Sequence, residues 1–145
     1  MRQQLSDREF ELWVQMSSAD RLHSILVAKR VLKELPGDET VLAAGLLHDV
    51  GKVAVRSGVA TRIAAYVAKP IISAELLNRL ALRRSFFSNL KSFLNYPRLG
   101  ADLLEGAGSD EFVVRWAAEH HLRKDKWTVD ERRGEVLVRA DYLAV

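Results

Sequence analysis

The stretch GLLHDVGKV, residues 45–53, places a histidine and an aspartate side by side at the end of an apolar segment. No charged residue occurs between Val41 and Leu47, so His48 and Asp49 follow a helix that is expected to be buried. The macrodipole already makes the C-terminus of a helix negative, which disfavours a carboxylate there. A buried Asp49 carboxylate therefore needs a cation, a strong set of hydrogen bonds or a raised pKa.

Two further residues with metal-binding side chains are expected to face the interior. His23 shares a helix face with Leu26 and Val27, and Asp141 shares one with Leu137 and Val138. A single inward histidine is more often a hydrogen-bonded core residue than a ligand, and a single inward aspartate is more often a cap or half of an ion pair. Two histidines and two aspartates from three helices, with few cationic residues on the same faces, favour a bound divalent cation. These ligands suit Mn, Fe, Ni, Co or Zn and, less readily, Mg.

Helices must position these side chains, and the whole chain has a helical pattern. Capping residues precede the expected helices, glycines and prolines stand at the breaks, and no stretch shows the sustained alternation of a half-buried strand. The pattern predicts an all-α fold, a single compact bundle-like domain of about six to eight helices. The expected helices cover residues 6–16, 17–35, 38–49, 57–84, 97–105, 110–121 and a last one that carries residues 134–145. Pro70 interrupts or restarts the fourth of these helices, and either Ser109 or Asp110 caps the sixth.

Two local features are also expected. Gly51 would end the helix that carries His48 and Asp49, in the usual role of a C-terminal glycine. The second helix would turn an apolar stripe to the core. That stripe comprises Leu22, Ile25, Leu26, Val31 and Leu32.

The composition, 48% hydrophobic and 28% charged in 145 residues, is typical of a soluble globular protein of one domain. The chain contains no cysteine, so any metal must be held by His, Asp or Glu. The charged N-terminus lacks a signal-peptide pattern, and no charge-free stretch approaches the ~20 residues of a membrane span. We therefore expect a cytoplasmic location.

Positive charge is concentrated in the middle of the chain: residues 52–98 contain nine Lys and Arg residues, and Glu75 is the only acidic residue among them. The net charge of the whole chain is +3. Such a zone favours anionic partners, either as a lid over a substrate or as a peripheral contact with an anionic membrane. Alternatively, its aromatic residues belong to the core and its charges form a solvated face. No DNA-reading motif is present, so specific DNA binding is not expected.

Five stretches, in order, resemble the landmarks of the HD superfamily of metal-dependent phosphohydrolases. AAGLLHDVGK (43–52) is similar to the central motif of the subgroup in which His-Asp continues to Gly and Lys, the HDIG-like type. The others are RLHSILVAKRV (21–31), YPRLGADLL (96–104), AAEHHL (117–122) and RADYLA (139–144). The resemblance covers most of the chain and implies a single HD domain over residues 1–145, with a basic and apolar helical insert at about 57–94.

The resemblance implies a divalent metal ion held by His23, His48, Asp49 and Asp141, with Asp49 and Lys52 as catalytic residues. The implied substrate is a small phosphate ester, such as a nucleotide, and Lys52 would contact its phosphate. Outside the family context, Lys52 would be a solvated loop lysine. The resemblance also implies that His120 and His121 line the substrate pocket, although both could simply end a helix, where a cationic imidazole is favoured.

Two positions depart from the family pattern. Tyr96 stands where the two-metal subgroup usually has a histidine, and Leu122 follows the His-His pair where that subgroup has an acidic residue. We therefore expect one metal rather than two, and the hydrolysis of cyclic dinucleotides is not expected. The departures also leave an alternative: a catalytically weak HD-fold binding or regulatory module that docks an anionic partner or a membrane surface.

Overall fold

The computed structural model describes residues 3–56 and 96–144, and all regular structure within these ranges is helical. The predicted all-α class is therefore confirmed. The predicted helical insert at about 57–94, with most of the basic segment, lies outside the described residues. The described elements are α1 (Asp7–Gln15), α2 (Ser18–Glu34), α3 (Glu39–Leu47), α4 (Lys52–Arg56), α8 (Tyr96–Ala107), α9 (Glu111–Glu119), the short 3-10 helix η1 (Lys124–Lys126) and α10 (Glu131–Leu143).

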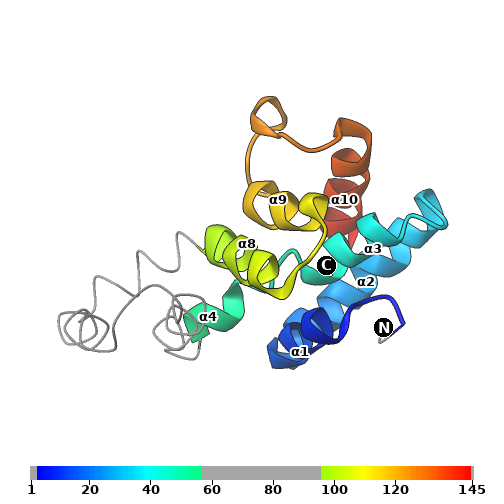
Figure 1. Cartoon of the computed structure of the whole chain (residues 1–145). Coiled ribbons are helices and arrows are strands. Elements are labelled where there is room, and N and C mark those ends of the chain that lie inside the picture. Colours follow the sequence, from blue (N-terminus) through cyan, green and yellow to red (C-terminus); the bar gives the residue numbers. More distant parts are fainter. Residues whose placement is uncertain (1–2, 57–95, 145) are drawn as a thin grey trace, which may run out of the picture.

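The uncharged helix α3 forms the centre of the core. Every residue from Val41 to Leu47 is buried, because α2, α9 and α10 pack against α3 from different sides (Figure 1). A helix that is apolar all round needs such complete cover. Gly45 permits the close approach of α2, since a Cβ atom there would lie 3.3 Å from a side-chain carbon of Val27. The end of α3 is thereby fixed within the core.

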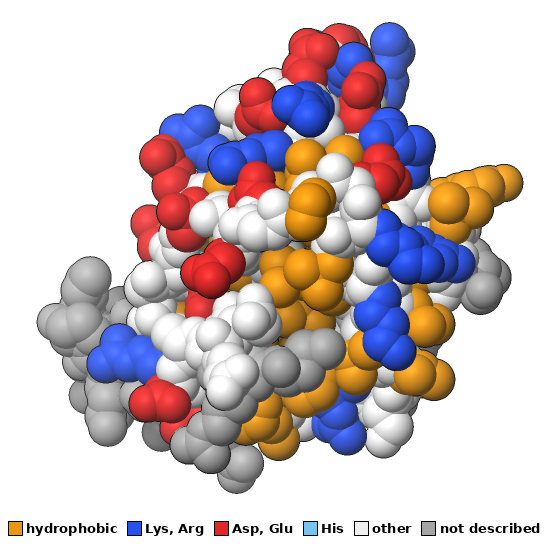
Figure 2. All heavy atoms as spheres, turned by 90° about the vertical axis from the view of Figure 1, so that its right-hand side faces the viewer, with side chains coloured by type: hydrophobic (Ala, Val, Ile, Leu, Met, Phe, Trp, Pro, Cys, Tyr) orange, Lys and Arg blue, Asp and Glu red, His pale blue; other side chains and the backbone are white. Residues whose placement is uncertain are grey.

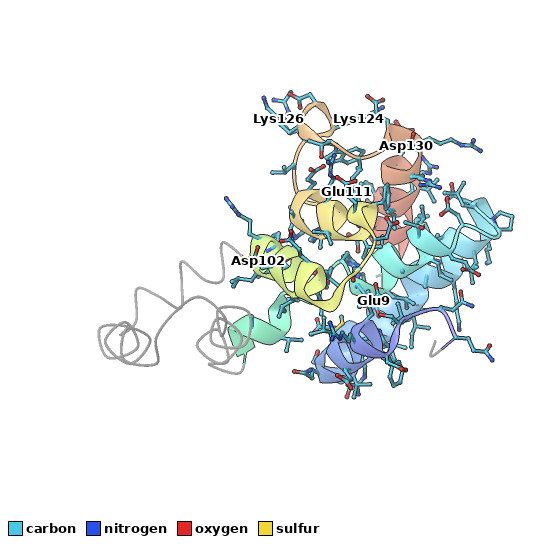
Figure 3. The ribbon with its side chains drawn as sticks, viewed as in Figure 1. Glu9, Asp102, Glu111, Lys124, Lys126 and Asp130 are labelled. Carbon is cyan, nitrogen blue, oxygen red and sulfur yellow. The ribbon has the colours of Figure 1, made fainter. Side chains whose placement is uncertain are left out.

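Side-chain caps determine where most of the helices begin. Ser6 and Glu9 form a reciprocal capping box at α1, and Glu9 is labelled in Figure 3. The other described caps accept a hydrogen bond from a backbone N–H in the first turn of the helix that follows, which satisfies an otherwise unpaired donor. These caps are Ser17 for α2, Asp38 for α3, Asp110 for α9 and Asp130 for α10.

The predicted apolar stripe of α2 is wrong in part. Leu22 and Leu32 have 60% and 45% of their surface exposed, respectively. The buried line runs instead through Ser24, Val27, Ala28 and Val31, with the spacing of one helix face. Ser24 is tolerated in the core because its hydroxyl accepts a hydrogen bond from the Trp13 indole at 3.0 Å and donates one to the Arg21 carbonyl.

Gly51 does not act as a left-handed helix stop. Of the described glycines, only Gly37 and Gly108 have a positive φ, 85° and 78°, and these follow α2 and α8. Gly51 lies in the turn between α3 and α4, where α8 comes so close that a Cβ atom would meet the Tyr96 carbonyl oxygen at 1.9 Å. Its role is therefore to let the start of α8 lie directly on the turn that carries Asp49.

The surface carries charges of both signs. On the face in Figure 2, Lys and Arg side chains alternate with Asp and Glu side chains around exposed apolar groups. The ion pairs include Lys124 with Glu131 at 3.0 Å and with Glu135 at 2.6 Å. Within the described part of the chain, no helix combines the length and the apolar character that crossing a membrane requires.

Candidate metal centre

His48 and Asp49 leave α3 at the point where that helix ends inside the core. Their side chains are only 4% and 6% exposed, respectively. The Nδ1–H group of His48 donates a hydrogen bond to the Gly45 carbonyl at 2.9 Å, because a carbonyl oxygen is only an acceptor. This bond fixes the imidazole so that Nε2 points at the carboxylates of Asp49, 3.5 Å away, and Asp141, 3.6 Å away.

His23 and Asp141 approach His48 from α2 and α10. His23 Nε2 lies 2.7 Å from Asp141 Oδ1, and the rings of His23 and His48 have centroids 5.5 Å apart. His23, His48 and Asp49 each offer one ligand atom, and these three atoms lie within 4.8 Å of one another. The structure thus brings together three of the four predicted ligands as one compact group, with Asp141 in contact with two of them.

The Asp49 carboxylate has several polar partners. Lys52 Nζ donates to Oδ2 at 2.5 Å, and the Tyr96 hydroxyl donates to Oδ1 at 3.4 Å. Lys52 also lies 3.7 Å from Asp20 on α2. The expectation that cationic partners would be scarce is therefore wrong for Asp49, because the turn through Gly51 brings Lys52 back over it. Lys52 remains partly open to solvent, with 36% of its side chain exposed.

These contacts shift the pKa values of the group in opposite directions. Burial would lower the pKa of His48, but the carboxylates of Asp141 and Asp49 and the Gly45 carbonyl raise it above its usual value. Burial would raise the pKa of Asp49, but His48, Lys52 and His120 hold it below its usual value. The pKa of Asp141 is lowered by its contact with His48, against its partial burial, and by His23. Both carboxylates are therefore ionised at neutral pH.

The Tyr96 hydroxyl, by contrast, is kept protonated. Burial raises its pKa, and the neighbouring carboxylates, Asp49 first among them, raise it further. Tyr96 therefore contributes a neutral O–H donor to the Asp49 carboxylate and is not available as a phenolate ligand.

His120 and His121, predicted to line the substrate pocket, take different positions after α9. The side chain of His120 is 3% exposed, and its Nδ1–H donates to the Ala117 carbonyl at 3.0 Å. His121 is exposed, and its Nε2 contacts the Tyr96 hydroxyl. Burial and repulsion from His48 and His121 lower the pKa of His120 to about 3, so its ring is neutral at physiological pH.

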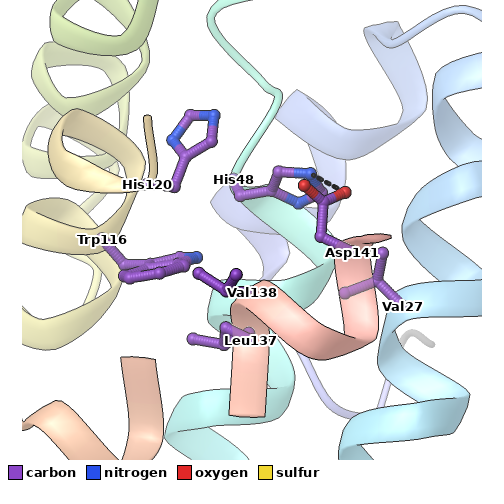
Figure 4. Close-up of a pocket in the computed structure, with 7 residues that line it drawn as sticks. All are labelled: Val27, His48, Trp116, His120, Leu137, Val138 and Asp141. Atoms are coloured by element: carbon purple, nitrogen blue, oxygen red, sulfur yellow. Dashed lines mark ion pairs between the residues drawn. The ribbon is translucent and has the colours of Figure 1, made fainter. Parts of the chain in front are cut away.

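A cavity of about 10 Å³ lies among His48, His120 and Asp141, with Trp116 in its wall. Figure 4 shows Asp141 and Val27 on one side of His48 and Trp116 and His120 on the other, with Leu137 and Val138 between these two sides. Val27, Leu137 and Val138 also line the cavity. This volume accommodates about one water molecule.

Sequence reasoning missed Asp20 and Trp116 and did not foresee the contact between Tyr96 and Asp49. The YPRLG stretch carried a usable signal, because it pairs Tyr96 with Gly100, and Gly100 lies against Gly51 with a Cβ position 3.0 Å from the Gly51 nitrogen. The spacing of Trp116 and His120, one helical turn apart, was a second signal that both face the same interior region.

Comparison with known proteins identifies the family. The sequence model for the HD domain matches residues 21–145, and the chain belongs to this family. HD domains are generally metal-dependent phosphohydrolases, and the four positions predicted as ligands all fall within the matched region. No curated protein and no solved structure matches the chain.

The residues present fit a divalent ion. Two imidazoles and two carboxylates supply nitrogen and oxygen donors without any thiolate, a set that suits first-row transition metals. Within the described residues, His120 Nε2 is buried without a hydrogen-bond partner and lies 3.9 Å from Asp49 Oδ1. The site therefore contains a polar atom that no protein group satisfies. His23, His48, Asp49 and Asp141 are the residues that would hold the ion.

Proposed function

We propose that this protein is a phosphohydrolase that cleaves a phosphate ester of a nucleotide or a related small phosphorylated metabolite. The observation that carries the proposal is the convergence of His23, His48 and Asp49, whose ligand atoms lie within 4.8 Å of one another. Membership of a family of metal-dependent phosphohydrolases supports the same conclusion. Asp141, in contact with both histidines, completes the proposed ligand set.

In this proposal, a bound divalent ion supplies Lewis-acid polarisation of the phosphoryl group and lowers the pKa of water. The two histidines orient the site, since His48 is fixed through Gly45 and His23 through Asp141. Lys52 has three N–H donors, so it can keep its contact with Asp49 and offer the others to a phosphate oxygen. The partial exposure of Lys52, 36% of its side chain, supports this role, because a phosphate in solvent can reach it.

The test is phosphate release from a panel of nucleotides and sugar phosphates. The protein is stripped of metal and reloaded separately with Mn, Fe, Co, Ni, Zn or Mg. We expect metal-dependent turnover that falls at least about 100-fold in Asp49→Asn, because that change removes a charged ligand and the closest charge partner of Lys52. Asp125→Asn is the matched control, since Asp125 is an exposed residue of η1, the short helix whose Lys124 and Lys126 are labelled in Figure 3. Equal activity in the two variants would refute the assignment of Asp49.

One contact favours the alternative of a binding or regulatory module with little turnover. Lys52 lies 2.5 Å from Asp49 Oδ2, so the buried carboxylate has a charge partner without a metal ion. The same panel separates the two functions. If protein that binds metal releases no phosphate from any substrate, the regulatory module becomes the better proposal, and binding to anionic vesicles would then identify its partner class.

A further inference from the structure

His120 carries a buried acceptor that no protein group satisfies. Its side chain is 3% exposed, and among the described residues its Nε2 has no hydrogen-bond partner. The nearest charged oxygen is Oδ1 of Asp49, 3.9 Å away, which is beyond hydrogen-bonding distance. A polar atom buried in this way costs stability unless something else binds it.

The two facing atoms are both acceptors. The ring proton of the neutral His120 imidazole is on Nδ1, which donates to the Ala117 carbonyl, so Nε2 presents only a lone pair. The carboxylate of Asp49 also only accepts hydrogen bonds. Two buried acceptors this close repel each other unless a donor lies between them.

We propose that a single buried water molecule bridges His120 Nε2 and Asp49 Oδ1, which makes His120 a positioning residue for Asp49. Water has two protons and can donate one to each acceptor, and a spacing of 3.9 Å allows both bonds at about 2.8 Å. Space for one water molecule exists beside His120, since a cavity of about 10 Å³ borders its side chain together with His48 and Asp141, although Asp49 does not line that cavity.

The consequence concerns the orientation of Asp49. Lys52 holds Oδ2, while Tyr96 and the bridging water hold Oδ1, so the plane of the carboxylate is fixed from both sides. His120 Nε2 lies 3.9 Å from Asp49 Oδ1, so in this proposal it acts on the carboxylate through the bridging water. This consequence rests on the proposed function, because it takes Asp49 to be a metal ligand.

The first test is a high-resolution crystal structure of the metal-free protein. We expect a water molecule within hydrogen-bonding distance of both His120 Nε2 and Asp49 Oδ1. A gap without density, or a protein group in that place, would overturn the proposal. The crystal structure tests the bridging water without any metal. The test is therefore valid even if the wild-type protein binds no metal and the proposed function is wrong.

The second test measures Mn²⁺ affinity by calorimetry in the full chain. His120→Phe keeps a flat ring but removes the acceptor, and we expect affinity about 10–100-fold below wild type, as for other groups that support a metal ligand. His120→Gln retains an acceptor and should stay within about threefold. Equal affinity in wild type and His120→Phe, or equal losses in both variants, would overturn the inference.

Electron spin-echo measurements on the Mn²⁺-loaded proteins count the imidazoles bound to the metal. The proposal requires the same number in wild type and in His120→Phe. Loss of one imidazole signal in the variant would make His120 a ligand, and the positioning role would then be wrong.

Discussion

At the scale of single residues, Asp49 combines deep burial with a full negative charge. Its side chain is 6% exposed, and its partners come from different parts of the chain: Lys52 from the start of α4, Tyr96 from α8 and His120 from the end of α9. Burial alone would favour the protonated acid. His48 and Lys52 outweigh it and hold the pKa of Asp49 below its usual value, so the carboxylate stays ionised and suited to a metal ion.

His120 predicts an acid sensitivity of the metal-free protein. Its pKa is lowered to about 3 in the folded state, against about 6.5 in an unfolded chain. As the pH falls below 6.5, the unfolded chain takes up a proton that the folded protein does not. The folded protein therefore has its full free energy of unfolding above pH 6.5 and loses part of it as the pH falls toward 3. The loss that comes from His120 is about 2 kcal/mol at pH 5.

Urea denaturation of wild type and His120→Gln at pH 7.5 and pH 5 measures this loss. The raised pKa of His48 acts in the opposite direction, since its stabilising proton is lost as the pH rises, so the comparison between the two proteins is the informative quantity. We expect the wild type to lose about 2 kcal/mol more than the variant over this range. An equal loss in both proteins would contradict the assignment of His120 as a buried neutral imidazole.

At the scale of elements, the turn through Gly51 couples two helices that are far apart in sequence. The start of α8 lies on this turn, because only a glycine leaves room for the Tyr96 carbonyl. The close approach brings the Tyr96 hydroxyl to Asp49. Tyr96 of α8 thus contributes to the site twice: its backbone carbonyl packs on the turn at Gly51, and its side-chain hydroxyl reaches Asp49.

Gly51→Ala should therefore be more damaging than a glycine substitution that strains only the backbone. A Cβ atom at residue 51 would lie 1.9 Å from the Tyr96 carbonyl oxygen and 2.8 Å from the Gly100 nitrogen, so α8 must move. We expect a loss of unfolding free energy of about 3 kcal/mol, at the upper end for overpacking.

Gly108→Ala is the control, since Gly108 has a positive φ but nothing within 4 Å of its Cβ position, and it should lose only about 1 kcal/mol. Denaturant unfolding of both variants checks the difference. A Gly51→Ala protein as stable as Gly108→Ala would show that the close approach has no energetic importance.

Some features of the helices could be predicted from the sequence, and others could not. Helix starts were predictable because a cap is local: Ser17, Asp38 and Asp110 each bind a backbone N–H within a few residues. The buried face of α2 was not predictable, because Leu22 is as apolar as a core residue. Only the helices that pack against α2 decide which of its faces is covered. Ser24 lies in the core because Trp13, on another helix, supplies its donor.

At the scale of the whole molecule, the candidate site depends on the fold bringing distant segments together. His23 on α2 and Asp141 on α10 are separated by 118 positions in sequence and by 2.7 Å in space. Helical spacing predicted that each faces inward, and the family resemblance supplied the expectation that they meet. The contacts of Lys52 and Tyr96 with Asp49 were not predicted, because they depend on the path of the turn through Gly51.

Because the proposed ligands come from α2, from the end of α3 and from α10, metal binding should stabilise the entire domain. An ion that binds only the folded protein raises the unfolding free energy by about 2.7 kcal/mol at a concentration 100 times its dissociation constant. Thermal unfolding with and without Mn²⁺ should show this as a rise in Tm, and the rise should be lost or much reduced in Asp141→Asn. Asp125→Asn, which changes an exposed residue of η1, should keep the full rise. A Tm that does not respond to any divalent ion, in protein free of bound metal at the start, would mean that these three helices do not share an ion.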